Sequence, residues 1–204
     1  MNTIRILKTT ISETSVNEVS KILNSKNSLK VAICNTNTVV RSYKDSELGN
    51  VINSFDIKTP DGFPIAKSSS ILYDNNQRRV DGYNVLLTTI REGLEKNTSH
   101  YFFGSEDYVL KKLTQNLQKE FPLINIVGSF SPPVSEFKEL TEEQYIQDIQ
   151  NFNPDIVWVS LGFPKKEKFI ELLQKKYRLE SNFVGIGAVF EWVAGTKIKA
   201  PEFI

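Results

Sequence analysis

Short runs of hydrophobic residues alternate along the chain with segments in which hydrophobic residues recur three or four positions apart. Such runs are typical of buried strands, and the wider spacing is typical of amphipathic helices. Strands are predicted at residues 4–7, 30–34, 55–57, 101–103, 124–127, 156–160 and 183–186. Strands that alternate with helices form a mostly parallel sheet with helices on both faces. The pattern therefore predicts a Rossmann-like α/β fold.

The segments between these runs predict the helices. They lie at residues 16–23, between 39 and 52, and at 83–96, 109–117, 142–150 and 165–176, with a last helix opened by Gly187. Residues 63–76 are more polar, and we expect a helix followed by a mobile loop there. No internal repeat or low-complexity linker interrupts the chain, so we expect one domain over residues 1–204.

Composition and charge narrow the class of protein. The 204 residues are 40% hydrophobic, and 25 Lys and Arg balance 24 Asp and Glu, for a net charge of +1. That balance gives no global field toward nucleic acid, which is not an expected partner. Cys34 is the single cysteine and His100 the single histidine, so no zinc site of nitrogen and sulfur ligands is expected. With no signal peptide or membrane-spanning stretch, we expect a soluble protein of the cytoplasm.

Five loops follow predicted strands and should meet at one edge of the sheet, where open α/β folds bind ligands. They are Asn35–Asn37, 61–62, 104–105, 162–166 and 185–187. Glycines before helix amino ends, together with lysines such as Lys166, favour a phosphate-bearing ligand for the set. For any single loop, an ordinary turn with a solvated lysine is the simpler interpretation.

Asp61 is the candidate for acid–base chemistry. A general base needs a carboxylate within hydrogen-bond reach of the proton that it removes. However, Thr59-Pro60-Asp61-Gly62 is also a typical type I turn sequence, and Asp61 could simply cap the next helix. Arg78 and Arg79 could bind a diphosphate bidentately or lie in a solvated loop. The chain has no Gly-x-Gly-x-x-Gly, no P-loop and no Asp-x-Asp, so we expect neither a nicotinamide cofactor nor a bound metal.

Several spaced motifs, taken together, resemble those of the WecG/TagA/CpsF glycosyltransferases over nearly the whole chain. In order they are Thr59-Pro60-Asp61-Gly62, Arg79-Val80-x-Gly82, Ile126-Val127-Gly128 with Ser131-Pro132-Pro133, Pro154-Asp155-Ile156-Val157, Leu161-Gly162-x-Pro164-Lys165-x-Glu167, and Ala194-Gly195 with Ala200-Pro201.

The resemblance implies a metal-independent, inverting enzyme. Such an enzyme moves N-acetylmannosamine or a similar sugar from a UDP-sugar to a lipid-diphosphate-linked saccharide, in the synthesis of teichoic acid or surface polysaccharide. It also implies that Asp61 is the catalytic base, that Asn37 lies in the sugar-binding loop and that Arg79 is the arginine of a family motif. The enzyme would then work as a peripheral protein at the inner face of the cell membrane.

The chain departs from the family pattern at several positions of the expected site. Asn35 replaces a threonine, Asn84 an aspartate, Lys166 a glutamine, Glu191 an aspartate and Lys199 an arginine. These changes suggest a different sugar. The sequence ends at Ile204, where similar proteins continue into a basic, aromatic appendage. We expect that appendage to be absent here and membrane binding to be weak.

Asp61 is thus predicted to be catalytic, and a set of loop residues to bind the substrates. The set is Asn35, Thr36, Asn37, Arg79, Gly104, Ser105, Gly162, Lys166, Gly187 and Glu191. A module that binds UDP-sugars without turnover is the main alternative. A nucleotide-sugar epimerase or dehydrogenase would need a nicotinamide site that the sequence lacks. The donor sugar, the acceptor and homo-oligomer formation are left open.

Overall fold

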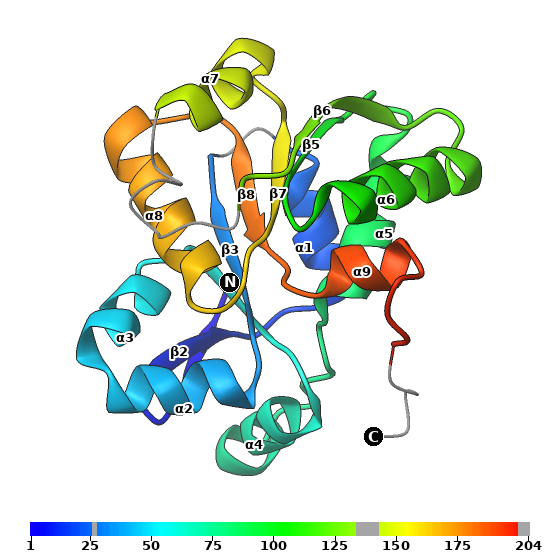
Figure 1. Ribbon diagram of the computed structural model, residues 1–204. Coiled ribbons are helices and arrows are strands. Elements are labelled where there is room, and N and C mark those ends of the chain that lie inside the picture. The colour runs from blue at the N-terminus through cyan, green and yellow to red at the C-terminus, as the bar shows by residue number, and fades with distance from the viewer. Residues whose placement is uncertain (26–27, 134–142, 200–204) are drawn as a thin grey trace.

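A six-stranded parallel sheet forms the centre of the protein (Figure 1). The computed structural model describes residues 1–25, 28–133 and 143–199. The strand order is β4-β3-β8-β7-β5-β6, and every neighbouring pair is parallel. The strands of this sheet are β3 (Lys30–Cys34), β4 (Ile57–Pro60), β5 (Ser99–Gly104), β6 (Asn125–Phe130), β7 (Ile156–Ser160) and β8 (Asn182–Gly185).

Helices cover both faces of this sheet, as the hydrophobic pattern predicts. One hydrophobic cluster joins the sheet to α1 (Val16–Leu23), α5 (Gly82–Gly93), α6 (Asp107–Glu120) and α9 (Val189–Val193). A second cluster, on the other face, includes residues of α2 (Thr36–Lys44), α3 (Ser46–Asn53), α4 (Phe63–Tyr73), α7 (Glu143–Phe152) and α8 (Lys165–Tyr177). Successive strand residues alternate between the clusters, because side chains along a strand point to opposite faces: Ile156 and Trp158 join the first, Val157 and Val159 the second.

The observed strands differ from the predicted ones by one or two residues at several ends, and more substantially in β2, β4 and β6. The chain begins with an antiparallel hairpin of β1 (Thr3–Ile6) and β2 (Thr9–Ser12), and β2 was not predicted. β4 begins at Ile57, where the predicted strand ended. The prediction missed this strand because two of its buried residues, Lys58 and Thr59, are polar. The Lys58 ammonium donates to the carbonyl of Phe55, which compensates for its burial. β6 continues through Gly128–Phe130, which was expected to be loop.

Helix caps explain where several helices begin. Ser15 and Glu18 form a reciprocal capping box at the start of α1, and Asn35 caps α2 by accepting from the Thr38 N–H at 3.1 Å. Asp81 likewise caps α5. Within the described part of the chain, no helix combines the length and the apolar character that a bilayer crossing requires.

Candidate functional site

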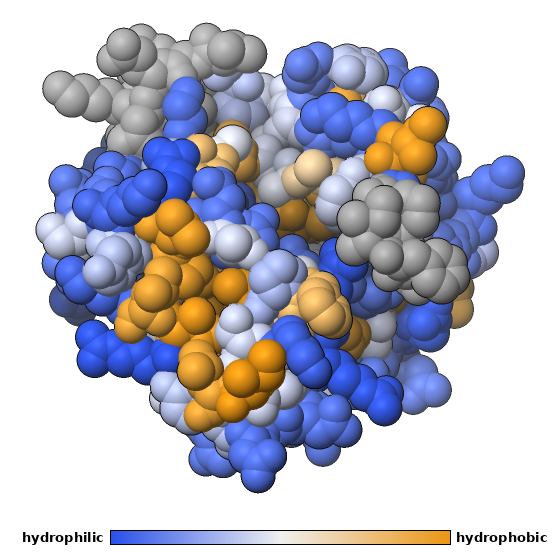
Figure 2. All heavy atoms as spheres, turned by 90° about the horizontal axis from the view of Figure 1, so that it is seen from below, coloured by the Kyte–Doolittle hydropathy of each residue, from blue (hydrophilic) through white to orange (hydrophobic). Residues whose placement is uncertain are grey.

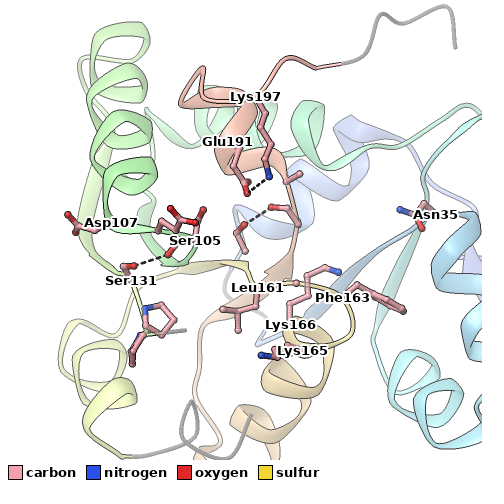
Figure 3. A pocket seen from close by; sticks show the side chains of 17 residues that line it. Asn35, Ser105, Asp107, Ser131, Leu161, Phe163, Lys165, Lys166, Glu191 and Lys197 are labelled. Carbon is pink, nitrogen blue, oxygen red and sulfur yellow. Dashed lines mark hydrogen bonds and ion pairs between the residues drawn. The ribbon is translucent and has the colours of Figure 1, made fainter. Parts of the chain in front are cut away.

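Two adjoining cavities open at the carboxyl edge of the sheet, where loops after the parallel strands converge. The larger has a volume of about 740 Å³ and the smaller about 230 Å³. Five residues line both and form their shared wall: Asn35, Phe163, Lys166, Gly187 and Ala188. Figure 3 shows the larger cavity, with Asn35 on one side and Ser105, Asp107 and Ser131 on the other. The prediction that these loops meet at one edge is confirmed.

Asp61 lies in the smaller cavity because of the register between β3 and β4. Cys34 pairs with Pro60 at the ends of these strands, and the Asp61 N–H donates to the Cys34 carbonyl at 3.0 Å. Asn35, which follows β3, and Asp61, which follows β4, therefore lie next to each other at the carboxyl edge of the sheet. Asn35 and Asn37 line the same cavity as Asp61, and Trp192 adds an aromatic side chain. A carboxylate, two amides and an aromatic ring are the groups with which proteins bind sugar hydroxyls and ring faces.

The environment of Asp61 favours proton acceptance. Burial raises the pKa of the Asp61 carboxyl, while a hydrogen bond from Arg79 opposes the shift. The Arg79 Nε lies 3.0 Å from Asp61 Oδ1, and the Arg79 side chain is about one-third exposed. A carboxylate whose pKa is raised binds a proton more readily than an ordinary aspartate does. Arg79 itself lines neither cavity.

Positive charge gathers at the shared wall, at the start of α8. Lys166 is buried there, and its ammonium lies 2.5 Å from the equally buried Glu167 carboxylate. The same ammonium lies 5.1 Å from the centre of the Phe163 ring. The N-cap residue of α8, Pro164, makes no capping hydrogen bond with its side chain. An ammonium beside a helix amino end is an arrangement that binds anions.

The larger cavity is lined by serines, glycines and prolines together with charged side chains of both signs. Ser131 Oγ donates to the Ser105 carbonyl at 2.8 Å, and Ser160 Oγ donates to the Gly187 carbonyl at 2.6 Å. Glu191 forms an ion pair with Lys197 at 3.2 Å, drawn as a dashed line in Figure 3. The second carboxylate oxygen of Glu191 is buried and accepts no hydrogen bond from the described residues. A ligand hydroxyl or N–H group could satisfy it.

Eight of the predicted site residues line at least one of the two cavities: Asn35, Asn37, Asp61, Ser105, Gly162, Lys166, Gly187 and Glu191. Thr36, Arg79 and Gly104 line neither. Thr36 is the exposed first residue of α2. Gly104 has a φ of +105°, and a Cβ atom there would lie 2.4 Å from the Ser160 carbonyl oxygen. Its place in the fold thus explains the glycine without a ligand contact.

Several cavity residues were not assigned to the site from the sequence. They include Ser160, Trp192, Lys197 and residues Ser131–Pro133, while Phe163 and Lys165 lie within the loop 162–166 that was predicted at this edge. The Ser-Pro-Pro motif was visible in the sequence, but only as part of a resemblance. Trp192 reads as one hydrophobic residue of a helix, and only the packing of α9 brings it beside Asp61. No cluster of three or more acidic, histidine or cysteine side chains arranged for a metal occurs among the described residues.

Comparison with known proteins finds several similar proteins that carry the same name. A similar protein of Bacillus subtilis (strain 168) is named N-acetylglucosaminyldiphosphoundecaprenol N-acetyl-beta-D-mannosaminyltransferase; it is 26% identical over 174 residues, 85% of this chain and 66% of the relative. Proteins of the same name occur in Bacillus spizizenii, at 28% identity over 75% of this chain and 57% of the relative, and in Staphylococcus aureus, at 23% identity over 87% and 67%.

The chain thus spans about two thirds or less of the length of these relatives. The model of the WecG/TagA/CpsF glycosyl transferase family matches residues 3–204, nearly the whole sequence. Of the motifs that carried the resemblance, those around Asp61, Gly82, Ser131 and Gly162 contribute residues to the two cavities, whereas Pro154–Val157 and Ala194-Gly195 do not, and Ala200-Pro201 lies outside the described residues. The chain therefore belongs to the WecG/TagA/CpsF family of glycosyl transferases.

Proposed function

We propose that the protein transfers an N-acetylmannosamine-like sugar from a UDP-sugar to a lipid-diphosphate-linked saccharide, with inversion and without a metal. The names of the relatives support this sugar and this class of acceptor. The observation that carries the proposal is the pair of adjoining cavities, one holding the partly buried carboxylate of Asp61 and both lined by Lys166. The product would serve teichoic acid or surface polysaccharide synthesis.

The two cavities suggest how the donor lies. The nucleoside would occupy the larger cavity, and the sugar would occupy the smaller one beside Asp61 and Trp192. The diphosphate would then cross the shared wall, within reach of Lys166 and the amino end of α8. A cation and backbone N–H groups fixed in a partly buried site stabilise the charge of a departing diphosphate without a metal ion.

The reaction follows from this placement as a single displacement. Asp61 removes the proton from the acceptor hydroxyl, and the oxygen of that hydroxyl attacks the anomeric carbon of the donor sugar. The bond between that carbon and the diphosphate oxygen breaks on the opposite face, and UDP leaves with the electron pair. One displacement inverts the anomeric configuration. Because its pKa is raised, Asp61 is a stronger base than an ordinary aspartate, as a general base requires.

Arg79 is proposed to act through Asp61. The hydrogen bond between them holds the carboxylate in one orientation and limits the rise of the Asp61 pKa. The sequence-based expectation that Arg79 neutralises the departing diphosphate stays a prediction. The pH dependence of an Arg79→Gln variant separates the two roles.

A module that binds UDP-sugars without turnover is the rival proposal, and substitution of the base tests between them. In the Asp61→Asn variant, we expect turnover to fall by about a hundredfold or more while UDP binding is retained, since only proton acceptance is lost. Calorimetry with a chelator present measures UDP binding. Asp74→Asn, the same chemical change at an exposed position with a φ of 49°, is the matched control.

Three outcomes would contradict the proposal. Wild-type protein that binds UDP-sugar but never transfers the sugar would favour the binding module. An Asp61→Asn variant with full turnover would remove Asp61 from the mechanism. UDP binding that disappears on chelation would exclude a metal-independent site.

Because the proposed acceptor is a membrane lipid, we also propose that the enzyme works as a peripheral protein at the inner face of the cell membrane.

A further inference from the structure

Helix α4 has an unusual distribution of side chains for a surface helix. Four large hydrophobic or aromatic side chains, here called the α4 patch, are 45–69% exposed: Phe63, Ile71, Leu72 and Tyr73. The buried residues of α4 are Ile65, Ala66 and Ser69. A surface helix normally turns its hydrophobic side inward and its polar side to water. In α4 a serine is buried while an isoleucine and a leucine face the solvent.

The α4 patch lies beside the proposed active site. α4 begins two residues after Asp61, and Figure 1 shows it at the end of the molecule toward which the chain leaves β3 and β4. Figure 2 views this end directly and shows that hydrophobic side chains gather on part of it. Exposed hydrophobic surface of this kind marks an interaction site.

Hydrogen bonds hold α4 in place. The Tyr73 hydroxyl donates to the Arg5 carbonyl at 2.7 Å and accepts from the Arg5 N–H at 3.1 Å, which ties the end of the helix to β1. Ser69 donates to Asn75 at 3.0 Å on the inner side. These bonds fix which side of α4 faces outward, so the exposed position of Ile71 and Leu72 is part of the folded structure.

The charges around the patch suit a negatively charged layer. Lys67 is exposed on α4, and Arg78 is exposed in the segment that follows. Asp74, also exposed, is the acidic residue next to Tyr73. Exposed Ile, Leu, Phe and Tyr side chains flanked by basic residues are typical of helices that lie at a membrane interface.

We infer that the α4 patch docks on the bilayer that carries the acceptor, with its side chains at the boundary between headgroups and hydrocarbon. The inference rests on the proposed function, because the relatives are named for an acceptor with an undecaprenol chain. A polyprenyl chain stays in the bilayer, so the acceptor saccharide is presented at its surface. Docking through α4 would bring Asp61 to that surface.

Vesicle co-sedimentation tests this docking without any turnover. The probe is a vesicle of phosphatidylcholine and phosphatidylglycerol without acceptor lipid. We expect Ile71→Gln/Leu72→Gln to lower partitioning onto vesicles at least tenfold, since two hydrophobic contacts are lost. Leu123→Gln is the matched control, because Leu123 is 77% exposed but lies before β6, at the opposite edge of the sheet. Its partitioning should equal that of the wild type.

Two further measurements keep the result interpretable. Thermal unfolding and UDP calorimetry should be the same for the double variant and the wild type, which shows that the fold and the donor site are intact. Failure of UDP binding in the wild type would count against the proposed function, whereas failure of vesicle binding alone counts against docking. Binding should persist in about 0.5 M NaCl, where charges are screened within a few ångströms.

The docking proposal is overturned if the wild type does not bind vesicles, or if the double variant binds as well as the wild type. It is also overturned if high salt abolishes binding, which would leave only an electrostatic attraction. Finally, analytical ultracentrifugation could reveal a wild-type dimer that the double substitution dissociates. The patch would then be a contact between two copies of this chain.

Discussion

The Arg79 Nε donates a hydrogen bond to Asp61 Oδ1 at 3.0 Å, although the two residues are 18 positions apart. Their contact joins the end of β4 to the segment before α5, where the Val80 N–H also donates to the Pro60 carbonyl at 2.9 Å. The arginine thus reaches the carboxylate from a backbone that is itself bonded to β4. This geometry makes Arg79 a positioning residue for Asp61.

Replacement of Arg79 should therefore change the pH dependence of the reaction. Burial raises the pKa of Asp61 and Arg79 lowers it, so the Arg79→Gln variant should have an Asp61 of still higher pKa. The base acts when it is deprotonated, so the acidic limb of kcat/KM should move to higher pH, and activity should partly recover in alkaline buffer. The pH–rate profile of Arg78→Gln, an exposed neighbour, is the control. A loss that is the same at every pH would instead support a direct contact with the diphosphate.

Lys166 is expected to have two separable effects. Because Lys166 and Glu167 are both buried, Lys166→Gln leaves a buried carboxylate without its cation and should destabilise the fold by about 3 kcal/mol. It should also weaken UDP binding by about tenfold or more, as loss of a charged hydrogen-bond donor does. The double variant Lys166→Gln/Glu167→Gln should recover stability but not UDP affinity.

Urea denaturation and calorimetry on the same preparations measure these two effects. If UDP affinity returned together with stability in the double variant, Lys166 would be a structural residue and the diphosphate would be held elsewhere.

Gly104 should prove to be a structural requirement. Its φ of +105° is strained for any other residue, and a Cβ atom would lie 2.4 Å from the Ser160 carbonyl oxygen. The backbone strain alone should cost Gly104→Ala roughly 1–3 kcal/mol of unfolding free energy. Gly162→Ala is the control, because a Cβ atom there meets nothing within 4 Å. Equal urea midpoints for the two variants would contradict this explanation.

His100 should make the fold less stable in mild acid. Burial lowers the pKa of His100 to about 4, and its Nδ1 accepts a hydrogen bond from the Trp158 indole at 3.2 Å. The unfolded chain, with an ordinary histidine pKa near 6.5, binds a proton that the folded protein excludes. The contribution of neutral His100 to the free energy of unfolding is complete above pH 6.5. It is lost as the pH falls toward 4, and the total loss is roughly 3 kcal/mol.

Urea unfolding at a series of pH values measures this dependence. The His100→Gln variant should be less stable at neutral pH, but its stability should fall less steeply between pH 6.5 and 4. Parallel curves for the variant and the wild type would show that His100 does not account for the acid sensitivity.

The sequence predicted the parallel sheet because its strands are continuous hydrophobic runs. β3 was predicted to the residue, since Val31, Ala32, Ile33 and Cys34 form an unbroken run of buried apolar residues after Lys30. β4 was misplaced because Lys58 and Thr59 are buried polar residues, and their burial depends on Phe55 and the sheet around them. Strand patterns reveal hydrophobic burial, but not polar groups whose partners come from tertiary structure.

The sequence likewise predicted only part of the candidate site. Residues that follow strands, such as Asn35 and Asp61, could be placed at one edge because parallel strands share their direction. The partner of Arg79 and the position of Trp192 could not be deduced, since both depend on how loops and α9 pack. Gly104 illustrates the opposite case: a glycine after a strand suggests a ligand, but the nearby Ser160 carbonyl accounts for it.

The pairing of Cys34 with Pro60 has a consequence for how this protein could diversify or be redesigned. The 22 residues between β3 and β4 form α2 and α3, but the position of Asp61 is set by the strand register and not by the length of this excursion. Insertions at the α2–α3 junction could therefore add new recognition surface and leave the base in place. A single residue inserted within β4 would turn every following side chain to the opposite face and carry the carboxylate out of its cavity.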